Sequence, residues 1–446
     1  MKVVLISTYE MGRQPFGLAS PTAWLQRAGA EATCLDLSRE PLDEEAVCAA
    51  QLVAFYVPMH TATRLAAGLV PRVRSLNPRA HLCFYGLYAP VNEGFLRGLG
   101  AGTILGGEFE PGLVSLVERL RRGDGAQVEP LVSLDRLHFF VPDRSRLVPL
   151  GEYARLIAGD GTRRTVGYTE ASRGCKHLCR HCPIVPVYQG HFRVVDREVV
   201  LEDVRRQVTA GARHITFGDP DFFNGVGHAV AIVRRLHEEL PSVTYDVTIK
   251  IEHLLKHREH LATLCETGCL FVTSAVESID DRVLTLLDKG HTRADFLEAL
   301  CLCRAAGLTL SPTFVTFTPW TTLDGYRELL RLLAEQDLIP NVAPIQLAIR
   351  LLIPAGSRLL ELPEVLSIVG AFDEAALSYR WDHPDARMDP LCRDIQALVK
   401  RAEGRRATRD EIFRQIWRMA YDKAPPDTRD RIDRAAIPYI NEPWYC

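Results

Sequence analysis

Residues 175–182 read Cys-Lys-His-Leu-Cys-Arg-His-Cys, so three thiols lie in one short loop, separated by three and then by two residues. Thiolates are soft ligands that suit iron–sulfur clusters or zinc. Three thiols fill three corners of a four-iron cluster and leave the fourth iron open to a small chelating molecule. A structural zinc site usually has four protein ligands and pairs two short Cys-x-x-Cys runs, whereas this loop has no matching second run. We therefore favour a cluster over zinc completed by His177 or His181, and over unligated thiols.

Length and composition indicate a globular protein with more than one domain. Of the 446 residues, 47% are hydrophobic and 24% are charged, which is ordinary for soluble globular proteins. The net charge of −3 and the lack of an apolar run long enough to span a bilayer predict neither a nucleic-acid nor a membrane partner. The N-terminus is typical of a strand and not of a signal peptide. Twelve cysteines without an export signal indicate thiols and metal in place of disulfides, so we expect a cytoplasmic protein.

Strand and helix patterns divide the chain into four segments and predict an α/β fold. Residues 1–125 alternate short apolar runs with helices, which predicts a Rossmann-like, doubly wound parallel sheet. Residues 126–162 are typical of a connector. Residues 163–360 contain six strand–helix units, with the sixth strand at 345–352, and predict a partial (β/α)6 barrel with its chemistry at the C-terminal strand ends. Residues 361–446 are expected to form a helical extension.

The spacing of the thiols resembles the C-x-x-x-C-x-x-C signature of the radical S-adenosylmethionine (SAM) superfamily. The resemblance implies that Cys175, Cys179 and Cys182 bind a [4Fe-4S] cluster whose open iron takes the amino and carboxylate groups of SAM. It implies an enzyme in which an electron from the cluster cleaves a carbon–sulfur bond of SAM. An external reductant such as flavodoxin or ferredoxin would supply that electron. His181 stands where the family usually has an aromatic residue.

Polar residues follow three of the predicted barrel strands, and the resemblance suggests SAM contacts for them. Asp219 and Asp221 end the second strand and are candidates for binding the methionine ammonium, with a solvated turn as the alternative. Lys250 ends the third strand and could pair with the SAM carboxylate, with an exposed lysine as the alternative. Glu277 and Ser278 end the fourth strand and resemble the Glu-Ser pair that holds the SAM ribose.

The N-terminal segment resembles the cobalamin-binding domain that many radical SAM proteins carry. The family's D-x-H-x-x-G loop is missing, because residues 9–15 read Tyr-Glu-Met-Gly-Arg-Gln-Pro after the first strand. An axial histidine ligand therefore has no counterpart. We expect a degenerate domain that covers the barrel, with cobalamin bound without a protein histidine as the alternative.

The C-terminal residues 441–446, Asn-Glu-Pro-Trp-Tyr-Cys, resemble the tail of a radical SAM subgroup. That subgroup ends in Cys-Cys-Ala-Glu-Pro or Cys-selenocysteine-Ala-Glu-Pro, and this chain stops at the first Cys. The subgroup includes enzymes resembling arsinothricin-pathway synthases, which transfer a 3-amino-3-carboxypropyl group from SAM to trivalent arsenic. The resemblance implies a catalytic thiol at Cys446, with truncation at a selenocysteine codon. The alternative is a native terminus with one inert thiol.

These observations predict a transferase that cleaves SAM and moves a SAM-derived carbon group onto a small molecule, specifically trivalent arsenic. Two alternatives stay open. One is a cobalamin-dependent radical SAM methyltransferase. The other is an iron–sulfur electron carrier or sensor that never cleaves SAM, although such a protein would not need the ribose site expected at Glu277.

Overall fold

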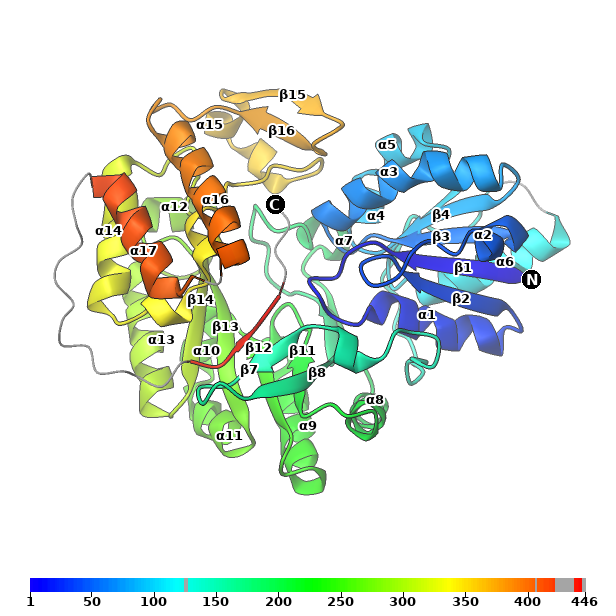
Figure 1. Cartoon of the computed structure of the whole chain (residues 1–446), viewed down its shortest axis with the longest axis horizontal. Coiled ribbons are helices and arrows are strands. Elements are labelled where there is room, and N and C mark those ends of the chain that lie inside the picture. Colours follow the sequence, from blue (N-terminus) through cyan, green and yellow to red (C-terminus); the bar gives the residue numbers. More distant parts are fainter. Residues whose placement is uncertain (124–126, 406, 422–436, 443–446) are drawn as a thin grey trace.

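Two sheets built mainly of parallel strands, each covered by helices, make up most of the molecule (Figure 1). The computed structural model describes residues 1–123, 127–405, 407–421 and 437–442. The N-terminal sheet lies beside the larger second sheet (Figure 1). No helix within these ranges combines the length and the apolar character that crossing a membrane requires.

The first sheet confirms the predicted doubly wound architecture. Its six strands are parallel, in the order β2-β1-β3-β4-β5-β6. The strands are β1 Lys2–Ser7, β2 Glu31–Asp36, β3 Leu52–Tyr56, β4 His81–Tyr85, β5 Thr103–Gly107 and β6 Val132–Ser133. The helices are α1 Phe16–Arg27, α2 Glu44–Ala49, α3 His60–Leu76, α4 Tyr88–Val91, α5 Glu93–Gly98 and α6 Glu110–Arg122. In sheets of this order, ligands bind beyond the carboxyl ends of the strands.

Both faces of this sheet are buried, which explains the continuous apolar runs in its strands. Along β1, Val4 and Ile6 pack into one hydrophobic core. Val3 and Leu5 pack into a second core on the opposite face, as the two-residue period of a strand requires. Helices α2 to α5 contribute to the first core, and α1 and α6 contribute to the second (Figure 1). A parallel sheet covered on both sides needs apolar residues at nearly every position.

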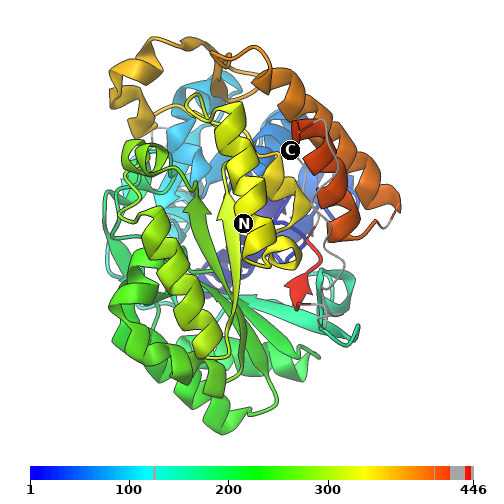
Figure 2. The ribbon, with the colours of Figure 1, turned by 90° about the vertical axis from the view of Figure 1, so that its left-hand side faces the viewer.

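The second sheet is a curled half-barrel in the order β14-β13-β12-β11-β8-β7-β17, with helices packed outside it (Figure 2). The strands are β7 Arg155–Ile157, β8 Arg163–Thr169, β11 His214–Phe217, β12 Thr244–Thr248, β13 Cys269–Glu277, β14 Thr309–Phe314 and β17 Tyr439–Ile440. The helices are α8 Arg197–Thr209, α9 Val226–Glu239, α10 Ile251–Lys256, α11 Leu261–Glu266, α12 Asp281–Leu286, α13 Arg293–Ala305 and α14 Leu323–Glu335. The five central strands are parallel, while β7 and β17 are antiparallel to their neighbours.

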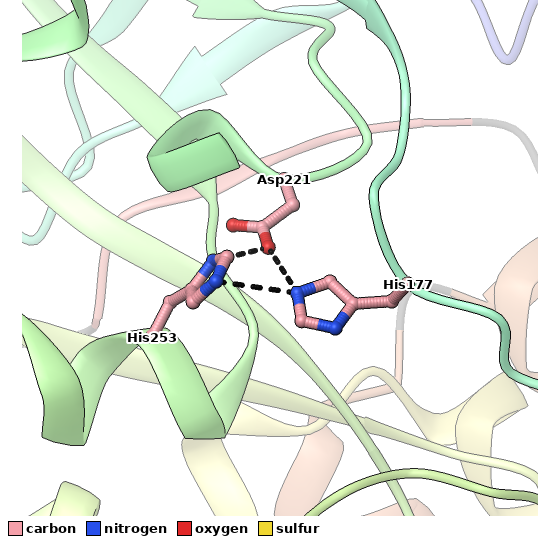
Figure 3. A group of neighbouring side chains, drawn as sticks. All are labelled: His177, Asp221 and His253. Atoms are coloured by element: carbon pink, nitrogen blue, oxygen red, sulfur yellow. Dashed lines mark hydrogen bonds and ion pairs between the residues drawn. The ribbon is translucent and has the colours of Figure 1, made fainter. Parts of the chain in front are cut away.

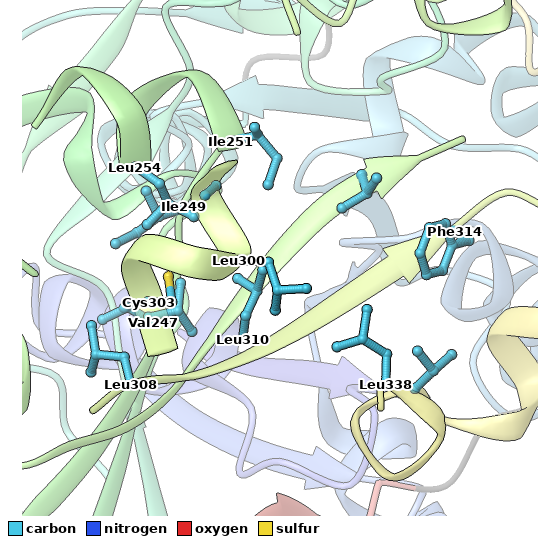
Figure 4. Close-up of a cluster of buried hydrophobic side chains, with 14 of the residues drawn as sticks. Val247, Ile249, Ile251, Leu254, Leu300, Cys303, Leu308, Leu310, Phe314 and Leu338 are labelled. Carbon is cyan, nitrogen blue, oxygen red and sulfur yellow. The ribbon is translucent and has the colours of Figure 1, made fainter. Parts of the chain in front are cut away.

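A large hydrophobic core joins this sheet to its helices (Figure 4). Val247 on β12, Leu300 on α13 and Leu310 on β14 are all fully buried in it. Burial of each such side chain contributes about 1.5–3 kcal/mol to the stability of the fold. The core therefore fixes the strand ends, where the candidate site residues follow.

The predicted sixth strand, 345–352, is wrong in its extent. The structure has a 3-10 helix, η5, at Pro344–Leu347, because proline favours the first turn of a helix and provides no N–H to a strand ladder. A single parallel bridge then joins Phe317 to Arg350. Within the described residues, the barrel has five full parallel strands and this one bridge.

The C-terminal segment is helical in part and also contains strands that were not predicted. Its helices are α15 Pro363–Leu366, α16 Met388–Arg405 and α17 Arg409–Tyr421. Its strands are the hairpin β15 Val369–Asp373 and β16 Ser378–Trp381, together with β17. Phe372 and Tyr379 face each other across the hairpin with ring centroids 5.2 Å apart, and such aromatic pairs stabilise antiparallel strands.

A buried arginine joins the two halves of the chain. Arg173 lies on β9 (Ser172–Gly174), a short strand paired antiparallel with β10 (Phe192–Val194). Its guanidinium donates to Glu108 Oε2 at 3.1 Å and to Glu110 Oε1 at 2.7 Å, both of which follow β5. Charge-assisted bonds of this kind are strong, and removing one partner leaves the other as an unpaired buried charge. The cross-link therefore holds the first sheet against the rim of the half-barrel.

Candidate cluster site and interdomain cavity

The cysteine loop 175–182 lies between β9 and the short helix α7 (Val185–Tyr188), on the C-terminal side of the half-barrel strands. Cys175 and Cys179 are buried, and Cys182 is half-buried. Gly174, just before the loop, has a φ of +73°, and a Cβ there would collide with the ring of Tyr188. Only glycine fits such a crowded left-handed position, so the entry to the loop is fixed by the backbone.

The surroundings of the three thiols fit a metal cluster. Burial, together with the neighbouring thiols of Cys179 and Cys175, raises the pKa of Cys182 to about 12. A thiol becomes a metal ligand when the metal replaces its proton. Two buried cations lie nearby, because Lys250 Nζ is 3.8 Å from Cys179 Sγ and the charge of Lys289 acts on Cys182. This positive environment suits an anionic thiolate cluster.

Lys250 is buried beside the cysteine loop, so the alternative of an exposed lysine is excluded. It lies at the C-terminal end of β12, directly before α10, where the sequence placed it. Its ammonium also lies 3.4 Å from Glu252 Oε2. One buried cation therefore faces both the loop and the barrel rim.

Glu277 connects the end of β13 to the cysteine loop. Its Oε1 accepts hydrogen bonds from His181 Nε2 at 3.0 Å and from Lys289 Nζ at 3.4 Å. Burial opposes ionisation, but Lys289 and then His181 outweigh it and lower the pKa of Glu277 to about 2. Its φ of +67° is unusual for a residue other than glycine and is a form of strain that clusters at functional sites. Ser278 Oγ accepts from the backbone N–H of Asp280 at 3.1 Å and so shapes the adjoining turn.

Asp219 supports the start of the cysteine loop. Its two oxygens accept from Ala171 N at 2.9 Å and from Ser172 Oγ at 2.5 Å. Burial raises the pKa of Asp219 to about 7, although the hydrogen bond from Ser172 acts to lower it. Both oxygens are thus used within the protein, next to the strand that leads to Cys175.

Asp221 lies on the same rim and begins the 3-10 helix η2 (Phe222–Gly225), where its side chain accepts from Phe223 N at 3.2 Å. Its second oxygen faces His177 of the cysteine loop and His253 of α10. Burial would raise the pKa of Asp221, but these two imidazoles lower it to about 2. The alternative of a solvated turn is excluded for Asp221, which is buried.

A cavity of about 260 Å³ lies between the two sheets, beside the cysteine loop. The lining residues that the argument uses are Glu10, Arg13, Tyr56, Tyr168, Glu170 and Gly174. Burial raises the pKa of Glu10, with a further contribution from the charge of Glu170, and burial likewise raises the pKa of Glu170. The cavity therefore offers carboxyl groups, a guanidinium and aromatic rings to a small molecule.

The C-terminal segment closes against this region. Strand β17 pairs with β7, and Asn441 N donates to Arg155 O at 3.0 Å. Glu442 forms a partly buried ion pair with Arg13, which lines the cavity. Cys446, the predicted catalytic thiol, lies outside the described residues. The described part of the tail thus reaches the wall of the cavity.

Sequence reasoning assigned no role to several residues of this region, namely Glu10, Arg13, Arg173, His253 and Lys289. Glu10 and Arg13 follow β1, and the rule that ligands bind at the carboxyl ends of parallel strands could have identified them. The other three gain their roles from contacts with distant segments, which local patterns do not contain.

A comparison with protein families finds one match, to the half-barrel part of the chain. Residues 169–333, which hold the cysteine loop and most of the half-barrel, match the family model described as the radical SAM superfamily. This part of the chain is similar to the radical SAM superfamily. That family implies a [4Fe-4S] cluster and SAM, in agreement with the thiols and nearby cations of the loop.

Proteins similar to this chain include a methylase and methyltransferases. A hopanoid C-3 methylase from Methylococcus capsulatus is 26% identical over 325 residues, which is 69% of this chain and 62% of that protein. The chain thus spans less than two thirds of that relative's length. Two solved structures share the fold: the cobalamin-dependent SAM radical enzyme OxsB (TM-score 0.71, 15% identity, 90% of this chain and 67% of that chain), and the radical SAM methyltransferase TsrM from Kitasatospora setae (TM-score 0.62, 17% identity, 76% and 72%). At these identities the likeness shows the fold alone.

Proposed function

We propose that this protein is a radical SAM transferase that moves a SAM-derived carbon group onto a small molecule bound in the interdomain cavity. The observation that carries the proposal is that the cavity touches both ends of the cysteine loop. Gly174, which lines the cavity, immediately precedes Cys175. Ile184, which also lines it, follows Cys182 by two residues. A carbon radical formed at the loop would therefore arise next to a molecule held in the cavity.

Five residues have direct roles in this proposal. Cys175, Cys179 and Cys182 hold a [4Fe-4S] cluster, which when bound supplies the electron that breaks a carbon–sulfur bond of SAM into a thioether and a carbon radical. Lys250 offers its ammonium to the SAM carboxylate. Glu277 binds the ribose with the oxygen that His181 and Lys289 leave free.

Three other predicted residues take positioning roles. Asp219 holds Ala171 and Ser172 in place ahead of the loop. Asp221 starts η2 and contacts a loop histidine. Ser278 shapes the turn after β13. Since protein groups already engage these side chains, we propose that they orient the SAM site without contacting SAM directly.

The specific reaction that we propose is transfer of the 3-amino-3-carboxypropyl group to trivalent arsenic. The docked tail supports it, because Glu442 pairs with Arg13 on the cavity wall. Cys446 follows Glu442 by four positions, and four positions of extended chain span at most about 14 Å. A soft thiol within that reach suits a thiophilic acceptor. Addition of the radical to arsenite, followed by a second electron from the external reductant and loss of hydroxide, leaves trivalent arsenic with a new carbon bond.

Cobalamin-dependent methylation is a second candidate, favoured by the fold shared with OxsB and TsrM. Two features of this chain count against it. The loop from Thr8 to Pro15 contains no histidine that could serve as a cobalt ligand. The cavity of about 260 Å³ is also small, below the usual range of about 300–1,000 Å³ even for drug-sized ligands.

Anaerobic reduction of the cluster-loaded chain with SAM and arsenite, followed by mass spectrometry, tests the proposal. Transfer of the 3-amino-3-carboxypropyl group predicts methylthioadenosine together with the organoarsenical. Cobalamin-dependent methylation predicts S-adenosylhomocysteine instead. A cluster that is reduced and reoxidised while SAM stays intact would refute the transferase and favour an electron carrier or sensor.

The tail needs its own control. Cys446→Ser should lower turnover with arsenite, whereas Cys48→Ser should not, because Cys48 is an exposed thiol on α2, in the N-terminal domain. Equal turnover in the two variants would exclude Cys446 from the reaction.

A further inference from the structure

A buried trio of His177, Asp221 and His253 lies beside the cysteine loop, and its side chains point toward one another (Figure 3). Each residue comes from a different element: the loop, the segment after β11, and the first turn of α10. His177 Nε2 lies 3.6 Å from Asp221 Oδ2 and 3.2 Å from His253 Nε2. His253 Nδ1 lies 2.6 Å from Asp221 Oδ2.

Hydrogen bonding leaves part of this trio unsatisfied. Asp221 Oδ2 and His253 Nδ1 are close enough for an ion pair, yet neither makes a well-directed hydrogen bond within the described part of the chain. The Asp221 and His253 side chains are 0% and 1% exposed. Leaving buried polar atoms without an aligned partner typically costs about 1–3 kcal/mol each. A cation between the three side chains would satisfy all of them at once.

We propose that His177, Asp221 and His253 bind one divalent transition-metal ion, with Zn²⁺ the ion that the donor set suits, separately from the cluster. Two imidazoles and one carboxylate are a common set of three protein ligands for zinc, with a fourth position left open. Bonds of about 2.0–2.2 Å in a tetrahedron place ligand atoms about 3.3–3.6 Å apart. The separations of 3.2 and 3.6 Å are close to that range, and the 2.6 Å separation, which is measured to the other nitrogen of His253, is shorter. Rotation of the His253 ring lets one nitrogen face both partners.

Neighbouring residues complete the environment that a zinc ligand needs. His177 Nδ1 lies 3.5 Å from Glu252 Oε2, and a carboxylate on the far nitrogen of a ligating histidine orients the ring toward the metal. Lys250, the nearby buried cation, is itself paired with Glu252 at 3.4 Å. His177 is 14% exposed, which gives an ion a route into the otherwise buried trio.

The proposed ion would fasten the cysteine loop to the barrel rim. His177 lies between two of the loop cysteines, whereas Asp221 and His253 belong to the rim. Asp221 also starts η2, which carries Asn224, and Asn224 Oδ1 lies 3.8 Å from Cys175 Sγ. The inference goes beyond the proposed transfer reaction and does not depend on it.

Zinc loading of the cluster-containing chain tests the inference. The chain is treated with one equivalent of Zn²⁺ and freed of unbound metal, and its metals are counted and examined by X-ray absorption at the zinc edge. We expect one zinc per chain with nitrogen and oxygen ligands at about 2.0–2.2 Å and no sulfur at about 2.3 Å. The iron content should stay unchanged.

Variants assign the zinc to the trio. His253→Gln and Asp221→Asn should each lose at least nine tenths of the bound zinc. His257→Gln should keep it, because His257 directly follows α10 and lies outside the trio, with its ring 5.7 Å from that of His253. Zinc–sulfur distances in the wild type, zinc retained by both trio variants, or no stoichiometric zinc would each overturn the proposal. The wild-type spectrum decides the ligand type even if a variant fails to fold.

Discussion

Replacing Glu277 with glutamine removes one charge from the contact between β13 and the cysteine loop. Glu277→Gln keeps the size of the side chain and an oxygen that can accept from His181. The variant loses the ion pair with Lys289, whose ammonium lies 3.4 Å from Glu277 Oε1 and is 4% exposed. Lys289 would then be a buried cation without its carboxylate partner. Removing one partner of a buried ion pair in this way is strongly destabilising.

The expected loss of stability follows from the pKa of Glu277. A fall from 4.5 to about 2 corresponds, at about 1.36 kcal/mol per pH unit, to about 3 kcal/mol. This value agrees with the cost of about 3–5 kcal/mol for breaking a buried ion pair by removing one partner. Because the folded-state pKa is lowered, this contribution is complete above pH 4.5 and is lost as the pH falls toward 2. The difference between wild type and variant should thus be constant from pH 7 to pH 5.5.

Urea unfolding of both proteins in the same cluster-loaded state measures this difference. Glu252→Gln is the matched control, since Glu252 also lies 3.4 Å from a lysine, Lys250, but is 40% exposed. Exposed pairs contribute about 0–1 kcal/mol. A loss below about 1 kcal/mol for Glu277→Gln at pH 7, or a loss equal to that of the control, would refute the assigned role of the buried pair.

Three further outcomes are expected. Replacing all three cysteines of the loop 175–182 with alanine should remove nearly all of the roughly four irons of a reconstituted cluster; an iron content equal to that of the wild type would contradict the site. Glu442→Gln leaves Arg13 without its carboxylate, so hydrogen exchange in the β17 amides should speed up at least tenfold, and unchanged exchange would mean that the ion pair does not hold the tail. Arg119→Met leaves the buried Glu129 without the guanidinium whose Nε donates to it at 3.0 Å. The variant should lose about 3–5 kcal/mol of stability, measured by thermal unfolding, and a loss within 1 kcal/mol would show the pair to be dispensable.

The first sheet and the cysteine loop could be predicted because their signals are local. Buried apolar runs such as Leu52–Tyr56 appear directly in the sequence, and so does the spacing of the thiols. The prediction of a sixth strand was wrong because its apolar residues are equally compatible with the 3-10 helix that Pro344 begins. The hairpin β15–β16 was not predicted because its alternation of apolar and polar residues is short and lies in a charged segment.

The contacts of the site residues could not be predicted, because they depend on segments far apart in the chain. Lys250 was as consistent with an exposed lysine as with a ligand, and only tertiary burial decides between them. Glu277 was placed correctly on the rim, yet its bonds to His181 and Lys289 come from two other elements. The pairing of Glu442 with Arg13 spans 429 residues, a separation that no local pattern encodes.

The edge of the half-barrel sheet stays incomplete until residues 439–440 have left the ribosome. Strand β7 has β8 on one side and β17 on the other, and the contact between Arg155 and Asn441 spans 286 residues. At about 5–20 residues per second, synthesis of that stretch takes on the order of tens of seconds. During that time one side of β7 is an open template for pairing with another chain. Slow or interrupted translation should therefore promote aggregation of nascent chains through β7, and chains that end before residue 439 would carry this open edge permanently.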